Sequence, residues 1–114
     1  MKIKYRVKSH QDFQSVIHEN KTLSNRCFVC YYKVNELDHA RIGISTSKKL
    51  GNAVIRNKIR RQVRMMAKEV INFDKNIDYC IIVKKAYLSN DYATNLNELS
   101  ILINKINRRI ENEI

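Results

Sequence analysis

One apolar stretch, residues 79–83, limits the possible folds more than any other part of the sequence. An apolar run without polar alternation is typical of a central strand that is covered on both faces. It follows an amphipathic segment whose apolar residues recur every three or four positions, which is the spacing of one helix face. These residues are Ile55, Ile59, Val63, Met66 and Val70. A strand is also predicted before that helix, over residues 41–46, so the order strand, helix, strand predicts a βαβ unit with parallel strands.

Shorter elements are predicted on either side of this unit. Phe13, Val16 and Ile17 follow the possible N-cap Ser9 at helical spacing and predict a short helix over residues 9–20. Residues 26–34 are rich in β-branched and aromatic side chains and predict a strand, which is expected to form a hairpin with residues 41–46. A last helix is predicted over residues 91–111. Whether residues 1–8 form an edge strand or a basic arm stays open.

These elements predict an α+β protein, a two-layer α/β sandwich in which three helices pack on a small mixed sheet of three or four strands. The expected order is α-β-β-(β)-α-β-α, where the strand in brackets is optional. The 114 residues include no proline, two glycines and no low-complexity segment. Residues 1–114 are therefore expected to form a single domain.

Positive charge is concentrated in one quarter of the chain. The sequence has 22 Lys and Arg against 11 Asp and Glu, a net charge of +11, and residues 41–68 contain no Asp or Glu at all. Cations recur every four residues in the middle helix and therefore lie on one face. They are Arg56, Arg60, Arg64 and Lys68, with Lys58 and Arg61 beside them. Like charges at this spacing repel, so the row is better explained by a polyanionic partner than by solubility alone.

Several other classes of protein are disfavoured. No stretch approaches the roughly 18 apolar residues of a membrane span, and no apolar run follows the basic N-terminus, so a cytoplasmic protein is expected. Cys27 and Cys30 are predicted on opposite faces of one strand, and the histidines are scattered, so neither group predicts a metal site. The basic segment lacks the paired carboxylates or histidines of a stand-alone nuclease.

Two further features concern nucleic-acid binding. Lys48 and Lys49 precede the middle helix, whose N-terminus can hold a phosphate, although the spacing of a nucleotide-binding P-loop is missing. In the strand at residues 26–34, alternation places Val29 and Tyr31 on the face opposite to their neighbours. One face must pack in the core and the other can stack on unpaired bases, but alternation alone does not choose between them. A ribosomal or duplex-DNA-binding protein with a basic recognition helix is the alternative to a single-strand binder.

Residues 47–64 closely resemble the signature of the protein subunit of bacterial ribonuclease P. Further matches follow the same order along nearly the whole chain, at residues 12–13, 25–26, 28–29, 41–45 and 78–82. Proteins of that family assist a catalytic RNA that removes the 5′ leader from precursor tRNA. The resemblance implies a ribosomal protein S5 domain 2-like fold with a left-handed βαβ crossover, whereas the general rule favours a right-handed one.

The resemblance also implies two RNA-binding surfaces. The first faces the catalytic RNA and consists of Arg56, Asn57, Lys58, Arg60, Arg61, Arg64 and Lys68. The second borders a cleft for the single-stranded leader and consists of Phe13, Ile17, Val29, Tyr31, Lys48 and Lys49. The family commonly has Arg at position 58 and an aromatic residue at position 17. Lys58 therefore lacks a bidentate fork, and Ile17 offers apolar contact in place of stacking.

The expected partners are ribonuclease P RNA, one copy for each protein, and precursor tRNA, with no membrane. No catalytic residue and no metal ligand are expected in the protein, and the protein alone is expected to be inactive. Mg²⁺ is expected to be held mainly by the RNA, and no organic cofactor is implied.

Overall fold

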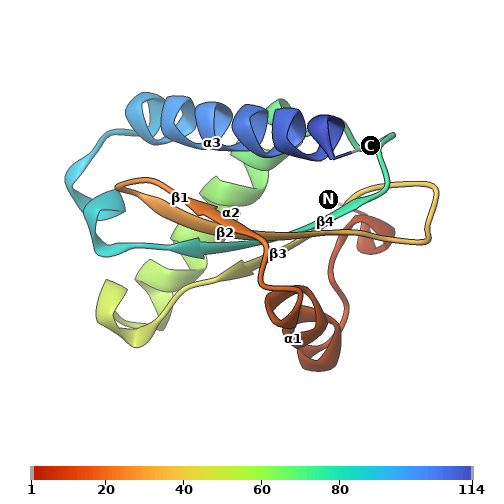
Figure 1. Ribbon diagram of the computed structural model, residues 1–114. Helices are drawn as coiled ribbons and strands as arrows, with labels where there is room; N and C mark the ends of the chain where they lie inside the picture. Colours follow the sequence, from red (N-terminus) through yellow and green to blue (C-terminus); the bar gives the residue numbers. More distant parts are fainter. Residues whose placement is uncertain (1, 114) are drawn as a thin grey trace.

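Figure 1 shows a computed structural model of the protein, in which residues 2–113 are described. The helices are α1 (His10–His18), α2 (Ala53–Val70) and α3 (Tyr92–Asn112). The strands are β1 (Thr22–Ser24), β2 (Phe28–Val34), β3 (Arg41–Ser45) and β4 (Ile77–Val83). Three short 3-10 turns are η1 (Ile3–Tyr5), η2 (Lys48–Leu50) and η3 (Lys85–Ser89). The order α1-β1-β2-β3-α2-β4-α3 confirms the predicted α+β class, with four strands in the sheet.

The strands form one mixed sheet in the order β1-β2-β4-β3. β4 pairs parallel with β3 and antiparallel with β2, which confirms both the βαβ unit and the central position of the apolar run. The predicted hairpin between residues 26–34 and 41–46 is wrong, because β4 lies between β2 and β3. This arrangement gives both backbone edges of β4 a hydrogen-bonding partner, and every residue of β4 except Ile82 is buried.

Helices α2 and α3 cover one face of the sheet and form the main core with it. Cross-strand pairing places Phe28, Cys30 and Tyr32 of β2 on this face, opposite apolar residues of β4. The helices contribute Ile59, Val63, Met66, Ala67, Leu99, Leu102, Ile103 and Ile106. Ile55 was expected on the buried stripe but is 41% exposed, because it lies in the first turn of α2, beyond the edge of this core.

Helix α1 packs on the opposite face of the sheet, below it in Figure 1. Gly43 of β3 permits the close approach, since a Cβ at this position would lie 2.9 Å from Cδ2 of Phe13. Cys80 of β4 lies under the same turn, with its Sγ 4.0 Å from the carbonyl oxygen of Phe13. Val16 is the buried residue of α1. The helix is thus held against the centre of the sheet.

A side-chain cap fixes the beginning of each α-helix. In every case a side-chain oxygen accepts a hydrogen bond from the backbone N–H three residues later, which contributes about 1 kcal/mol. The pairs are Ser9 with Asp12, Asn52 with Ile55, and Asp91 with Thr94. These caps explain why the predicted helix beginnings were accurate.

For the N-terminal segment, the sequence left an edge strand and a basic arm as open alternatives. Residues 2–8 form the turn η1 and then a single parallel bridge between Arg6 and Ile42, beyond which the N–H of Val7 donates to the Ile42 carbonyl at 2.9 Å. This is an anchored arm, not a full edge strand. Residue 1 lies outside the described residues.

The chain between α1 and β2 also differs from the prediction. The short strand β1, which the sequence did not indicate, pairs antiparallel with β2. Asn25 Oδ1 accepts hydrogen bonds from the N–H groups of Cys27 and Phe28, so the chain bends there and β2 begins at Phe28, not at residue 26. Cys27 therefore lies in a bend before the strand and packs in the same core as Cys30, not on an opposite strand face.

Candidate nucleic-acid interface

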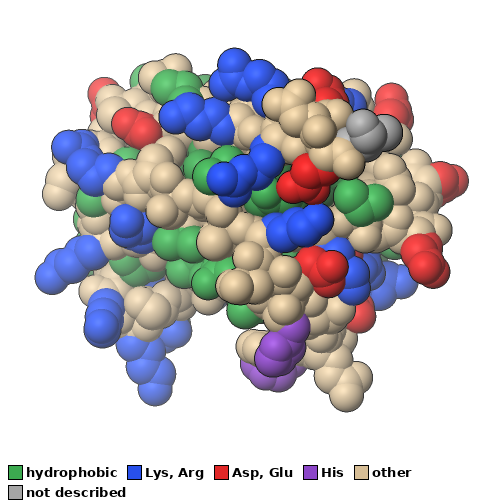
Figure 2. All heavy atoms as spheres, in the orientation of Figure 1, with side chains coloured by type: hydrophobic (Ala, Val, Ile, Leu, Met, Phe, Trp, Pro, Cys, Tyr) green, Lys and Arg blue, Asp and Glu red, His purple; other side chains and the backbone are tan. Residues whose placement is uncertain are grey.

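The cations of α2 lie on one unbroken helix of 18 residues, so their four-residue spacing places them on a common face. We call Arg56, Arg60, Arg64 and Lys68 the α2 cation row. In Figure 2, basic side chains gather at the lower left, where Figure 1 draws the junction of β3 and α2. Within residues 2–113, no ion pair includes a cation of α2. The positive charge of the row is therefore available to an external anion.

Neutral partners orient Arg60 without cancelling its charge. Its guanidinium donates to Oγ1 of Thr46 at 2.6 Å and to Oδ1 of Asn57. Asn57, which was predicted to contact RNA, thus also positions a neighbouring cation. Thr46 follows β3, so the contact fixes the row relative to the sheet.

Arg64 lies among other positive charges. Burial lowers its pKa, and the nearby charges of Arg6 and Arg60 lower it further. Arginine side chains nevertheless stay charged in proteins, so Arg64 remains a cation of the row. Nε of Arg56 is buried without a hydrogen-bond partner among the described residues. A phosphate at this face would relieve repulsion between cations.

The two lysines before α2 are exposed. Lys48 and Lys49 belong to η2, and Gly51 ends that turn with a φ of 141°, a conformation that side chains rarely permit. Asn52 then caps α2. The lysines therefore lie just before the helix N-terminus, where the backbone N–H groups favour anions.

Burial answers the question that strand alternation left open. Phe28, Cys30 and Tyr32 are at most 1% exposed, whereas Val29 and Tyr31 are only partly buried and lie on the face that α1 contacts. The accessible pair is thus the one that the family resemblance implied. Its contact with RNA stays a prediction.

A hollow of about 460 Å³ joins the beginning of α1 to α2 across the end of β3. Its lining includes Phe13 of α1, Ser45 and Thr46 at the end of β3, and Arg60 of the α2 cation row. One residue of the predicted leader cleft is therefore beside the predicted RNA-binding helix. The lining does not include the other predicted cleft residues, which are Ile17, Val29, Tyr31, Lys48 and Lys49.

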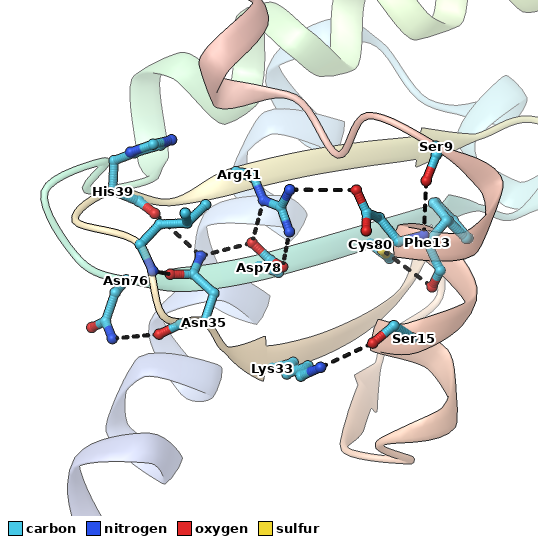
Figure 3. A network of polar contacts seen from close by, with 12 residues as sticks. Ser9, Phe13, Ser15, Lys33, Asn35, His39, Arg41, Asn76, Asp78 and Cys80 are labelled. Carbon is cyan, nitrogen blue, oxygen red and sulfur yellow. Dashed lines mark hydrogen bonds and ion pairs between the residues drawn. The ribbon is translucent and has the colours of Figure 1, made fainter.

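A buried polar network, which the sequence did not reveal, supports this face (Figure 3). Arg41 donates from Nε and Nη2 to the carboxylate of Asp78 at 3.0 and 2.7 Å, and Asn35 donates to the same carboxylate at 2.7 Å. Nη1 of Arg41 lies 3.6 Å from Oδ2 of Asp12 on α1. Lys33 of β2 donates to Oγ of Ser15 on α1 at 2.9 Å. Polar contacts thus tie α1 to the sheet on the side away from the hollow. The one sequence signal for this polar network was Asp78, an isolated acidic residue in an otherwise apolar strand.

Three other features weighed from the sequence concern metal ligands, thiols and membrane-spanning helices. Among residues 2–113, no three His, Cys, Asp or Glu side chains are grouped so that they could hold a metal ion. Cys27, Cys30 and Cys80 are buried free thiols, and burial raises the pKa of Cys80 to about 12. No α-helix in the described part combines the length and apolarity needed to cross a bilayer.

Comparison with known proteins agrees with this geometry. The family model described as Ribonuclease P matches residues 1–107. The ribonuclease P protein component of Mycoplasma mycoides is 44% identical over 93% of this chain and 99% of its own length. That of Streptococcus agalactiae is 45% identical over 81% of this chain and 84% of its own.

Solved structures show the same similarity. The ribonuclease P protein of Staphylococcus aureus superposes with a TM-score of 0.80 at 37% identity, over 90% of this chain and 94% of that one. The Thermotoga maritima protein gives a TM-score of 0.74 at 32% identity, over 85% and 94%. Sequence and fold thus agree, and the chain belongs to the ribonuclease P protein family.

Proposed function

We propose that this protein is the subunit of ribonuclease P that binds the catalytic RNA through α2 and the 5′ leader of precursor tRNA through the face beside α1. The observation that carries the proposal is the α2 cation row, which meets no acidic side chain in an ion pair within residues 2–113. Repulsion between the cations of such a row destabilises the free protein, and bound phosphates relieve that repulsion.

The physical task of such a subunit is to reduce repulsion. Ribonuclease P RNA and precursor tRNA are both polyanions, and they must come close together at the cleavage site. A small protein with a net charge of +11 can contact both and raise the local affinity for substrate. It also lowers the repulsion that limits binding of metal-bearing RNA to its substrate. One protein for each RNA suffices for this role.

The leader needs only a groove that accepts a single strand. Phe13 at the hollow, with Val29 and Tyr31 on the same side of the sheet, offers apolar and aromatic surface to unpaired bases. Arg60 at the hollow, and Lys48 and Lys49 before α2, supply charge for the backbone. Stacking and charge of this kind bind single strands without reading base edges.

The proposal assigns the cleavage reaction to the RNA. In this proposal, the Mg²⁺ that activates water or stabilises the leaving oxygen is held mainly by the RNA. Residues 2–113 contain no group of three candidate metal ligands. The protein's residues bind and orient the two RNAs, in the cytoplasm where tRNA is processed.

Reconstitution tests the proposal directly. Purified protein is titrated against ribonuclease P RNA and a precursor tRNA with a 5′ leader at low Mg²⁺, and the release of leader is measured. We expect the protein to stimulate cleavage and to be inactive without the RNA. Cleavage by the protein alone, or no stimulation, would contradict the proposal, as would sequence-specific binding to duplex DNA in place of stimulation.

A matched pair of variants separates the α2 face from general charge. The first replaces Arg60, Arg61 and Arg64 with Ala. The second removes the same number of exposed cations elsewhere, by Lys85→Ala, Lys105→Ala and Arg108→Ala. We expect the first variant to lose most of its stimulation and the second to keep most of it. Equal losses would mean that net charge, not the α2 face, supports the reaction.

A further inference from the structure

A pocket lies at the C-terminal end of the α2 cation row, at the opposite end of the helix from Lys48 and Lys49. It has a volume of about 620 Å³ and is lined by Lys2, Tyr5, Lys68 and Phe73. Two of these residues come from the N-terminal arm, one from the last turn of α2 and one from the turn that follows. The volume lies within the roughly 300–1,000 Å³ of sites that bind small organic groups.

Aromatic rings form part of the pocket wall. The ring of Tyr5 meets that of Phe73 edge-on, with centroids 5.0 Å apart and an interplanar angle of 63°. His39 packs edge-on against Tyr5 from the other direction, at 5.5 Å. Both Tyr5 and Phe73 remain partly exposed. The ammonium of Lys4 lies over the Tyr5 ring, 4.9 Å from its centroid, and occupies that side of it. The exposed parts of the two rings offer π surface to a further flat group, as base-binding pockets do.

The arm that carries Tyr5 is held in place. The carbonyl of Lys4 lies 2.8 Å from Nε2 of His39, and the N–H of Val7 donates to the carbonyl of Ile42 at 2.9 Å. Arg6 forms a parallel bridge with the same strand residue. The pocket is thus formed by the folded protein before any ligand arrives, which lowers the entropic cost of binding.

The charge at the pocket is positive and continuous with the cation row. Lys2 and Lys68 are exposed and make no ion pair within residues 2–113. Lys68 is the last member of the row, one turn beyond Arg64, whose electrostatic environment includes Arg6 of the arm. An RNA backbone that follows the row would therefore reach the pocket without leaving positive surface.

We propose that this pocket binds one unpaired nucleotide of ribonuclease P RNA, with its base against Tyr5 and Phe73 and its phosphates near Lys2 and Lys68. The inference rests on the proposed function and adds a second anchoring point to it. Catalytic RNA is favoured over the leader because the hollow at Arg60 lies two helical turns away, about 12 Å along the axis of α2. The site therefore acts on assembly of the two subunits, not on the choice of leader.

Binding of fluorescently labelled ribonuclease P RNA to single variants tests the ring and the charge separately. We expect Tyr5→Ala to raise the Kd by about 5- to 150-fold, the range for loss of one stacked base. Tyr5→Phe keeps the ring and should bind like the unmodified protein. Lys68→Ala should weaken binding and make the slope of log affinity against log salt shallower by about 0.7–0.9. Lys105→Ala, an exposed lysine on α3, is the matched control and should change neither quantity appreciably.

Crosslinking identifies the RNA at the pocket. With Tyr5→p-benzoylphenylalanine in the reconstituted holoenzyme, the crosslink should map to an unpaired nucleotide of ribonuclease P RNA. A crosslink confined to the leader, or binding by Tyr5→Ala equal to that of Tyr5→Phe, would overturn the inference. If the holoenzyme still cleaves precursor tRNA in those cases, the proposed function stands without it. Tyr5→Ala must keep its thermal transition, and if it unfolds, Lys2→Ala decides, because Lys2 lines the pocket but is not part of the α2 cation row. Weaker RNA binding by Lys2→Ala than by Lys105→Ala supports the pocket, and equal binding overturns it.

Discussion

Arg41 on β3 and Asp78 on β4 form a buried ion pair that joins two parallel strands under helix α1. Two hydrogen bonds connect the guanidinium to the carboxylate, and the Asp78 side chain is only 4% exposed. The hydrogen bonds that Arg41 donates to Asp78 raise the pKa of Arg41. Because Arg41 also lies near Asp12 of α1, the pair connects the sheet to the helix that carries Phe13. Stability and the shape of the proposed leader surface are therefore coupled at this point.

Arg41→Ala should destabilise the fold strongly. It leaves the buried carboxylate of Asp78 with only the Asn35 amide as a side-chain partner, and breaking a buried pair in this way typically costs about 3–5 kcal/mol. Urea unfolding followed by circular dichroism measures the loss. Lys75→Ala is the control, because its ion pair with Glu111 is exposed and should contribute less than about 1 kcal/mol. Similar losses for the two variants would show that the Arg41–Asp78 pair is not a structural anchor.

Gly43→Ala should move α1 away from the sheet. The added Cβ would lie 2.9 Å from Cδ2 and 3.1 Å from Cε2 of Phe13, closer than packed carbon atoms approach. Overpacking of this kind costs about 1–3 kcal/mol and displaces the ring that lines the hollow. We expect a lower unfolding free energy and weaker binding of precursor tRNA with a leader, but little change for tRNA without one. Ser24→Thr adds one methyl group on the exposed residue of β1 and should leave both properties intact. Equal effects on the binding of both tRNAs would show that Phe13 does not contribute to leader binding.

The helices, their caps and the parallel unit could be predicted because each depends on residues close in sequence. The predicted cap Ser9 acts within one turn of α1, and the lack of polar alternation in the β4 sequence already indicates a strand buried on both faces. Strand neighbours depend on distant residues instead. The hairpin prediction failed because β2 and β3 are adjacent in sequence, whereas β4 pairs with both.

The interface was predicted unevenly for a similar reason. The α2 cation row follows from helical spacing alone. The Arg41–Asp78–Asn35 network and the pocket at Tyr5 and Phe73 bring together residues separated by 37, 43 and 68 positions, so no local pattern contains them. Strand β1 was missed because three residues are too few to show alternation. Tertiary contacts, not local propensity, decide these features.

Assembly with RNA should depend steeply on salt. About five phosphate contacts with a single strand predict a slope near −3.5 for log affinity of the leader against log salt. Fluorescence anisotropy with a labelled leader oligonucleotide over a range of KCl concentrations gives this slope. A flat response would remove electrostatic bridging as the physical basis of the proposed function.

Arg61→Ala should weaken RNA binding without affecting the fold. Arg61 is exposed and makes no ion pair within residues 2–113. The substitution should therefore change the free energy of unfolding of the protein by less than about 0.5 kcal/mol. Arg60→Ala removes the hydrogen bond to Thr46 as well and should lower both affinity and stability. Thermal melts and RNA titrations on the same samples compare the two. If Arg61→Ala lowers the melting temperature but leaves RNA affinity unchanged, the assignment of Arg61 to an RNA-binding face of α2 is wrong.

The three cysteines should be unreactive in the folded protein. Burial raises the pKa of Cys80 to about 12, with a smaller contribution from Asp78, and burial also raises the pKa of Cys30. A raised pKa disfavours the thiolate, so at pH 8 the reactive form is suppressed in the fold.

The same shift in the pKa of Cys80 stabilises the folded state below the ordinary pKa of 9.0, and that stability is lost as pH rises toward about 12. A disulfide reagent at pH 8 should therefore titrate all three thiols only after denaturant is added, and the denaturant midpoint should fall above pH 9. Rapid reaction of one thiol in the native protein would reveal an accessible cysteine and reopen a redox role for it.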